Sequence, residues 1–180
     1  MHTRPEYTHG APSRMFEVRE DDLSGEQTRA LLALHLAGMH ANSSPGSVFA
    51  LDLSGLKRLE VTVWTAWRGD QLASVGALKM LADGNAEVKS MRTHPDFVRM
   101  GAADAILNTI IKAARGRGAL RLSLETGSGS AFEAALSLYR RRGFVNGAAF
   151  ADYEASEFNQ FLHLDLNDLP LTVCSPCTDL

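Results

Sequence analysis

The sequence has few cysteines and no long hydrophobic run. No segment approaches the ~20 consecutive apolar residues of a membrane-spanning helix, and the first fourteen residues lack the hydrophobic stretch of a secretory signal peptide. Of the 180 residues, 45% are hydrophobic and 22% are charged, which is typical of one soluble domain with a full core. We therefore expect a cytoplasmic protein that does not enter a membrane.

Both cysteines, Cys174 and Cys177, lie in the C-terminal sequence VCSPCTDL and form one C-x-x-C motif. A structural zinc ion takes four ligands, and this motif supplies two of them. Two free thiols on a C-terminal tail are the simpler interpretation, so we expect no metal site.

The chain also lacks an excess of positive charge and two common nucleotide-binding motifs. Its formal net charge of -3 at pH 7 and its pI of about 6.1 argue against binding to nucleic acid or to an anionic membrane. A G-x-G-x-x-G sequence and a G-K-[ST] sequence are both missing, which disfavours a Rossmann-type dinucleotide site and a P-loop. A small-molecule partner is the expected one.

The order of strand-like and helix-like patterns predicts one α+β domain over residues 15–166, between an N-terminal extension (1–14) and a C-terminal tail (167–180). Ser24, with Gln27 three residues later, is a plausible N-cap of the first helix. The prediction is a mixed sheet with helices on its faces. Strands are expected over 15–20, 61–69, 71–81, 86–94 and 120–126, with one or two more from 148–153 and 158–166; helices are expected over 21–40, up to Gly116 and over 130–144, and 48–60 fit a short helix or an ordered loop.

The loop that leads into the helix ending at Gly116 carries three small residues in a row, Gly101, Ala102 and Ala103. A helix N-terminus presents unpaired backbone N–H groups and the positive end of the helix dipole, so small side chains there leave room for an anion. Arg99 adds a positive charge nearby. Alternatively, the small residues serve only to let the helix pack closely on the sheet.

Two sequence elements together resemble the GNAT superfamily of acyl-CoA-dependent N-acetyltransferases. The window VRMGAA (98–103) is similar to the family's [Q/R]-x-x-G-x-[G/A] loop, with Val98 at the position of Gln or Arg, and AALSLYRRRGF (134–144) is similar to A-x-x-L-Y-x-x-x-G-F. KSMRT, RLSLETGS and FADY further resemble a subgroup of small stand-alone bacterial members. The resemblance covers about residues 15–166 and implies the GNAT fold, a mixed and mostly antiparallel central sheet flanked by helices.

The resemblance implies acetyl-CoA, or coenzyme A, as the acyl-donor substrate, with no metal. Main-chain groups at two positions of the preceding strand are expected to pair with the pantetheine arm, and the loop and helix start are expected to hold the pyrophosphate, with Arg99 able to replace the missing charge at Val98. The implied coenzyme A residues are Met91, Thr93, Val98, Arg99, Met100, Gly101, Ala102 and Ala103.

For catalysis, the family's tyrosine position corresponds to Tyr139, a phenol that could donate a proton to the departing thiolate. Glu87 is the first candidate for the base that deprotonates the amine, because it lies six residues before Thr93 and should share its face of the strand. A solvated strand-edge carboxylate is an equal alternative for Glu87, and the resemblance to the family also allows a water chain as the base. Glu125, at the end of the next strand, is the second candidate.

Other candidates would bind the acceptor. Arg92 could meet a substrate carboxylate or pair with an acid of the protein, His35 and His40 lie on the first helix, and Asp152 and Tyr153 lie in FADY. The expected activity is transfer of an acetyl group to a primary amine of a small molecule. A protein or peptide N-acetyltransferase and a non-catalytic acyl-CoA-binding module are the alternatives, and a homodimer is possible.

Overall fold

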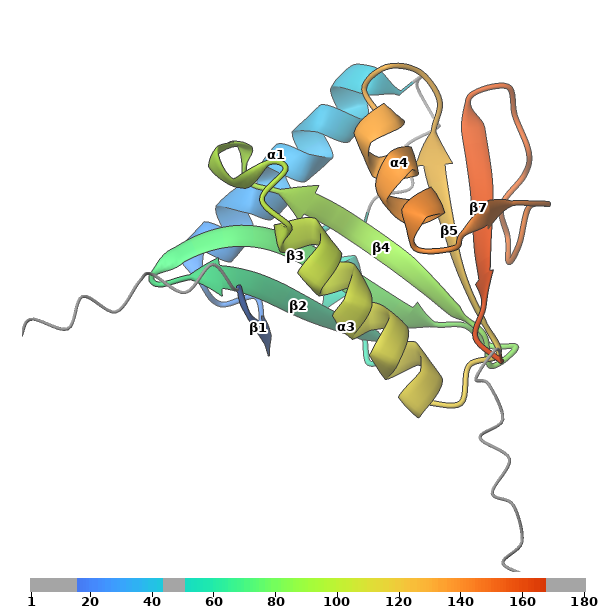
Figure 1. The fold of residues 1–180 in the computed structure, drawn as a ribbon, viewed down its shortest axis with the longest axis horizontal. Helices are drawn as coiled ribbons and strands as arrows, with labels where there is room; N and C mark the ends of the chain where they lie inside the picture. The colour runs from blue at the N-terminus through green and yellow to red at the C-terminus, as the bar shows by residue number, and fades with distance from the viewer. Residues whose placement is uncertain (1–15, 44–50, 168–180) are drawn as a thin grey trace, which may run out of the picture.

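The structure, a computed structural model, describes residues 16–43 and 51–167, and these form one mixed sheet with helices on both faces (Figure 1). The α+β architecture expected from the sequence is confirmed. Cys174 and Cys177 lie outside the described residues. The elements are β1 (Glu17–Glu20), α1 (Glu26–Asn42), α2 (Leu53–Leu56), β2 (Val61–Arg68), β3 (Gln71–Met80), β4 (Ala86–Thr93), the 3-10 helix η1 (Pro95–Phe97), α3 (Ala102–Gly116), β5 (Arg121–Gly127), α4 (Glu133–Arg141), β6 (Val145–Asn146) and β7 (Asn159–Asp165).

The strands lie in the order β1-β2-β3-β4-β5-β7-β6, and each neighbouring pair is antiparallel except β4 and β5. Gly69, with a φ of 62°, closes the β2–β3 hairpin at the turn expected from the sequence. In Figure 1, α3 crosses the front of the sheet and α1 lies behind it. Residues of α3 pack in the large core on one face, and Leu31 and Leu32 of α1 pack in a smaller core on the other. Within the described ranges, no helix is long and apolar enough to span a bilayer.

A β-bulge interrupts β4. Val75 pairs with Arg92 and Ala77 with Lys89, so Ser90 and Met91 together face the single residue Gly76. Ser90 has a φ of 53°, and a Cβ on Gly76 would lie 2.4 Å from the Met91 sulfur, so glycine is needed at this crossing.

The bulge shifts the alternation of side chains along β4. Lys89 and Arg92 pair with Ala77 and Val75, which pack toward α1. The expectation that Glu87 shares a face with Thr93 is therefore wrong, because a period of two holds only while the ladder is regular. Thr93 instead meets Ser74, with 3.4 Å between their hydroxyl oxygens.

Strands β4 and β5 pair only at their beginnings. The parallel ladder contains two pairs, Ala86 with Leu122 and Glu87 with Ser123, and stops there. Beyond these pairs the two strands separate, as Figure 1 shows from the lower right upward. Neighbouring strands in a continuous ladder lie about 4.8 Å apart, so the separation opens a space between the second halves of β4 and β5.

Two local predictions fail and one ambiguity is settled. Gly25, not Ser24, is the N-cap of α1, and Gln27 bonds instead to the β2–β3 turn, where its amide donates to the carbonyl of Asp70. Residues 148–153 form a turn closed by a 3.1 Å bond from the Tyr153 N–H to the Phe150 carbonyl, so they are not a strand. Within 48–60, α2 is a short helix, which the Asp52 side chain caps.

Candidate active site

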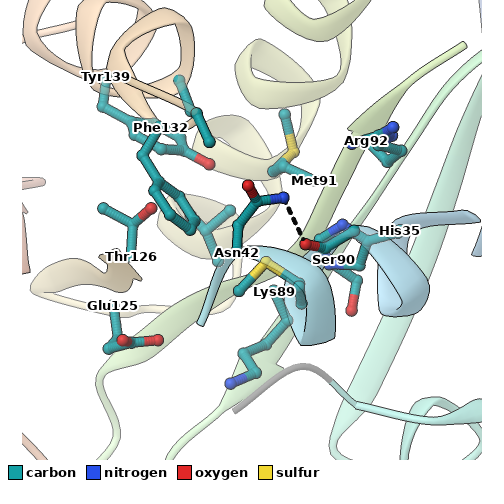
Figure 2. A pocket seen from close by; sticks show the side chains of 15 residues that line it. His35, Asn42, Lys89, Ser90, Met91, Arg92, Glu125, Thr126, Phe132 and Tyr139 are labelled. Carbon is teal, nitrogen blue, oxygen red and sulfur yellow. Dashed lines mark hydrogen bonds between the residues drawn. The ribbon is translucent and has the colours of Figure 1, made fainter. Parts of the chain in front are cut away.

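A pocket of about 170 Å³ lies where β4 and β5 separate (Figure 2). It is walled by the C-terminal half of α1, the bulged part of β4, the end of β5 and the start of α4. The residues that line it are His35, Gly38, Met39, Asn42, Val88, Lys89, Ser90, Met91, Arg92, Glu125, Thr126, Ala131, Phe132, Ala135 and Tyr139. In the view of Figure 2, Tyr139, Phe132, Thr126 and Glu125 lie along the left side, and His35 and Arg92 lie to the right.

Glu125 contributes the carboxyl group of the pocket. It lies on β5 two residues beyond Ser123, the last residue of β5 that pairs with β4. The pKa of Glu125 is raised to about 7, chiefly by burial; the positive charge of Lys89 lowers it, and the negative charge of Glu87 raises it. A carboxyl with a pKa near neutrality can exchange protons at the pH of a cell, which suits a general base.

Tyr139 contributes a phenol from α4. Its side chain is only 6% exposed and its ring packs against Phe144, with 5.7 Å between the ring centroids. Burial raises the pKa of Tyr139 well above its usual range, so its hydroxyl stays protonated. The residue can therefore donate a hydrogen bond or a proton toward the pocket.

Glu87 lies beside the pocket in a buried polar cluster and does not line it. Its side chain is 2% exposed; one carboxylate oxygen accepts a hydrogen bond from Lys89 Nζ at 3.2 Å and one from the Tyr153 hydroxyl at 2.5 Å. Lys89 also donates to the Tyr153 hydroxyl at 2.7 Å. Burial and the adjacent Glu87 carboxylate raise the pKa of Tyr153, which keeps its hydroxyl protonated as a donor.

His35 and Arg92 line the side of the pocket next to α1. Burial, together with the positive charges of Arg92 and Lys89, lowers the pKa of His35 to about 4, so this imidazole is neutral near pH 7. The Arg92 guanidinium lies against Gly38 of α1, with Nη1 3.6 Å from the place that a Cβ would take. Its Nε is buried and has no hydrogen-bond partner among the described residues.

The start of α3 lies apart from this pocket and presents backbone donors. Gly101 is the N-cap, with a φ of 92° that favours glycine, and no side chain caps the helix. Ala102 is buried, whereas Val98 and Arg99 are exposed, and Arg99 also has a positive φ of 62°. The N–H groups at the start of α3 therefore lie beside the small residues Gly101, Ala102 and Ala103, which suits an anion. The acid of the first turn, Asp104, is paired with Arg142.

Known proteins are similar to this chain in sequence and in fold. The model of the Acetyltransferase (GNAT) family matches residues 14–144, which is more than half of the chain. The chain belongs to the GNAT acetyltransferase family. It is therefore an acyltransferase, and the GNAT fold expected from the sequence is confirmed.

Individual GNAT relatives cover most of the chain. The uncharacterized N-acetyltransferase YedL of Escherichia coli K12 is 45% identical over 159 residues, which span 87% of this chain and 100% of the relative. A crystal structure from Klebsiella pneumoniae, assigned as an acyl-CoA N-acyltransferase, has a TM-score of 0.72 and 25% identity over 85% of this chain and 99% of that one. An acetyltransferase from Bacillus subtilis, solved in complex with CoA, has a TM-score of 0.62 and 21% identity over 83% and 98% of the two chains.

The GNAT fold places the candidate residues from the sequence in three groups. Met91, Arg92, His35, Glu125 and Tyr139 line the pocket. Glu87 and Tyr153 form the buried cluster beside it, and the residues from Val98 to Ala103 form the start of α3. Thr93, His40 and Asp152 do not line the pocket, and the side chains of His40 and Asp152 are exposed.

Several pocket residues of this GNAT chain were not anticipated from the sequence. Lys89 and Ser90 line the pocket at the bulge of β4, for which the sequence KSMRT gives no signal. Asn42 lies at the end of α1, and its amide donates to the Gly38 carbonyl at 2.8 Å, the bond drawn in Figure 2. Thr126 and Phe132 flank the β5–α4 connection. Phe132 packs closely on Gly127, where a Cβ would lie 2.6 Å from its ring.

Proposed function

We propose that the protein transfers an acetyl group from acetyl-CoA to the primary amine of a small molecule, by direct attack of the amine while both substrates are bound. The observation that carries the proposal is the convergence of Glu125 and Tyr139 on one pocket at the separation of β4 and β5. The modest volume of that pocket favours a small acceptor over a folded protein. The CoA complex of the structurally similar Bacillus subtilis acetyltransferase supports the choice of donor.

The start of α3 has the properties that a pyrophosphate site requires. Its first N–H groups have no acceptor within the helix, no side chain caps them, and the space beside Gly101 is open, with no heavy atom within 4 Å of the place that a Cβ would take. We propose that residues 98–103 hold the pyrophosphate of coenzyme A through their backbone, with Arg99 free to turn toward it. Main-chain groups of Met91 and Thr93 would pair with the pantetheine arm. When bound, acetyl-CoA supplies the acetyl group as a thioester.

Glu125 and Tyr139 would move the two protons that the reaction requires. The amine nitrogen forms the new bond to the acetyl carbon as the carbon–sulfur bond breaks. Glu125 accepts a proton from the amine nitrogen, for which its pKa of about 7 is suited, and Tyr139 donates one to the departing sulfur. Exchange with solvent then restores both groups. Glu87 is the less suitable base, because its carboxylate is held by Lys89 and Tyr153.

Two measurements test the proposed function. Coenzyme A should raise the melting temperature of the protein, as any ligand that binds only the folded state does. Acetyl-CoA should then release free coenzyme A thiol when the protein is incubated with suitable members of a panel of primary amines. If coenzyme A gives no stabilisation, the proposal is wrong. If it stabilises the protein but no amine or lysine peptide is acetylated, the chain is a binding module, and acetylation of peptides alone would indicate a peptide acetyltransferase.

Substitution of Tyr139 tests the proton donor. Tyr139→Phe keeps the ring in its packing against Phe144 and removes only the hydroxyl, so coenzyme A should still bind while kcat falls about 100-fold, the order expected for loss of a general acid. A variant that keeps both turnover and pH profile would exclude Tyr139 from the chemistry.

A further inference from the structure

Arg92 has a position and an environment that the transfer of an acetyl group does not by itself explain. It pairs across the sheet with Val75, which packs in the same core as Leu31 and Leu32 of α1, so its side chain projects on the α1 face. The start of α3, where the pyrophosphate is proposed to bind, belongs to the opposite face of the sheet (Figure 1). Arg92 therefore points into the half of the pocket that is left for the acceptor.

The guanidinium of Arg92 forms no ion pair with an acid of the described residues. Its Nε is buried without a hydrogen-bond partner, and no ion pair to Arg92 occurs within the described residues. Buried donors of a charged group are costly unless they are paired. The five ion pairs that do occur show that acids are available elsewhere on the chain, so an unmatched arginine facing a cavity is a candidate site for an anionic ligand.

The neighbours of Arg92 strengthen this interpretation. His35 contributes a neutral imidazole at this side of the pocket, which can hydrogen-bond without adding an opposing negative charge. Glu125 is the one acidic side chain among the described residues that line the pocket. In Figure 2, it lies on the side of the pocket opposite to Arg92. One end of the cavity is thus suited to an anion and the other to an amine.

We propose that the acceptor is an amine that carries a carboxylate, such as an amino acid, and that Arg92 binds this carboxylate while the amine faces Glu125 and Tyr139. The inference rests on the proposed function and narrows its substrate class. A planar guanidinium offers two parallel N–H groups that match the two oxygens of a carboxylate. Arg92 would then set both the affinity for the acceptor and the direction in which its amine points.

Matched substrates test the charge requirement. The panel contains amino acids with small, polar and apolar side chains, each assayed with its primary amide, which has the same shape but no negative charge. An amide also has the less basic amine and therefore offers more of the neutral nucleophile at a given pH, so chemistry alone favours the amide. We expect kcat/KM to be at least about 30-fold higher for the amino acids that are accepted, the size of a buried charged contact.

Variants of Arg92 test the assignment to this residue. Arg92→Gln should abolish the preference for amino acids over amides. It should lower kcat/KM for amino acids about 30-fold or more, through a higher KM, and should change kcat/KM for amides by less than about threefold. Arg92→Lys keeps the positive charge but loses the two parallel N–H groups of the guanidinium, so it should retain part of the preference for amino acids. Arg58→Gln is the control, because Arg58 forms an exposed ion pair with Glu60 away from the pocket.

The outcomes separate this inference from the proposed function. Acetylation of amides and simple amines in preference to amino acids would overturn the carboxylate, while leaving the acetyltransferase activity established. An equal loss for both substrate types in Arg92→Gln would make Arg92 a general structural residue and would overturn its assigned role. A melting temperature measured with coenzyme A for each variant distinguishes these results from misfolding.

Discussion

Glu87 and Glu125 carry the same chemical group on neighbouring strands, yet their surroundings in the structure differ. Glu87 lies at the last position of β4 that pairs with β5, is almost fully buried, and is bonded to Lys89 and Tyr153. Glu125 lies two residues beyond Ser123, the last residue of β5 that pairs with β4, lines the pocket and has a pKa raised to about 7. A distance of two residues along the separating strands distinguishes an internal ion from a titrating carboxyl.

The difference shows what the separation of β4 and β5 provides. Where the ladder is intact, a carboxylate can remain buried only with donors around it, and those donors hold it in place. Where the ladder ends, a carboxylate loses water without gaining such donors, so desolvation dominates and its pKa rises. We therefore expect substitutions around Glu87 to change mainly stability, and substitutions of Glu125 to change mainly turnover.

The largest effect should come from removing the cation beside Glu87. Lys89→Met leaves the buried carboxylate without its ion-pair partner at 3.2 Å, and the free energy of unfolding should fall by about 3–5 kcal/mol. Denaturant unfolding, analysed from the shift of the midpoint, measures this change. Lys112→Met is the control, since Lys112 is exposed on α3 and its replacement should change stability by less than about 0.5 kcal/mol.

A double substitution sharpens this test. Replacing both partners, Lys89→Met with Glu87→Gln, removes the buried charges together and should recover much of the lost stability. If the double variant is as unstable as the sum of the two single variants, the contact between Lys89 and Glu87 contributes little, and Glu87 is not primarily an internal ion.

The next effect concerns turnover. Glu125→Gln removes the proposed base but keeps the size of the side chain, so kcat should fall about 100-fold while stabilisation by coenzyme A is retained. The same change at the other carboxylate, Glu87→Gln, should reduce stability more than kcat. If Glu87→Gln causes the larger loss of kcat, the roles assigned to the two carboxylates are reversed.

Much of this contrast could not be predicted from the sequence. The motif VRMGAA and the tyrosine of AALSLYRRRGF predicted the start of α3 and Tyr139, because both depend on local spacing along one helix or turn. The face on which Glu87 lies depends on the extra residue in β4 at Ser90 and Met91, and one inserted residue reverses the alternation. The pocket itself depends on where the β4–β5 ladder stops, which is a long-range property of the sheet.

The pH dependence of turnover should follow the ionisation of Glu125. With a pKa of about 7, Glu125 must lose its proton to act as a base, so kcat should fall about fivefold between pH 7 and pH 6, about tenfold for each further unit below pH 6, and level off above pH 8. Glu125→Gln should lack this limb, whereas ionisation of the amine affects both proteins alike. The raised pKa of Glu125 also makes stability depend on pH, because the folded state favours the neutral carboxyl. The wild type should therefore lose stability as pH rises from about 4.5 to about 7, and Glu125→Gln should not show this loss.

The smallest effect is expected from removing the hydroxyl of Tyr153, which can be compared with the same change at Tyr139. Tyr153→Phe removes the donor to Glu87 but keeps the ring against Phe150 and Phe161, and Glu87 retains Lys89, so stability should fall by only about 1–2 kcal/mol, with kcat within about threefold of wild type. Tyr139→Phe should do the reverse, with a large loss of kcat and little change in melting temperature. If Tyr153→Phe lowers kcat as much as Tyr139→Phe does, the cluster around Glu87 takes part in proton transfer, and the division between an internal ion and a titrating base fails.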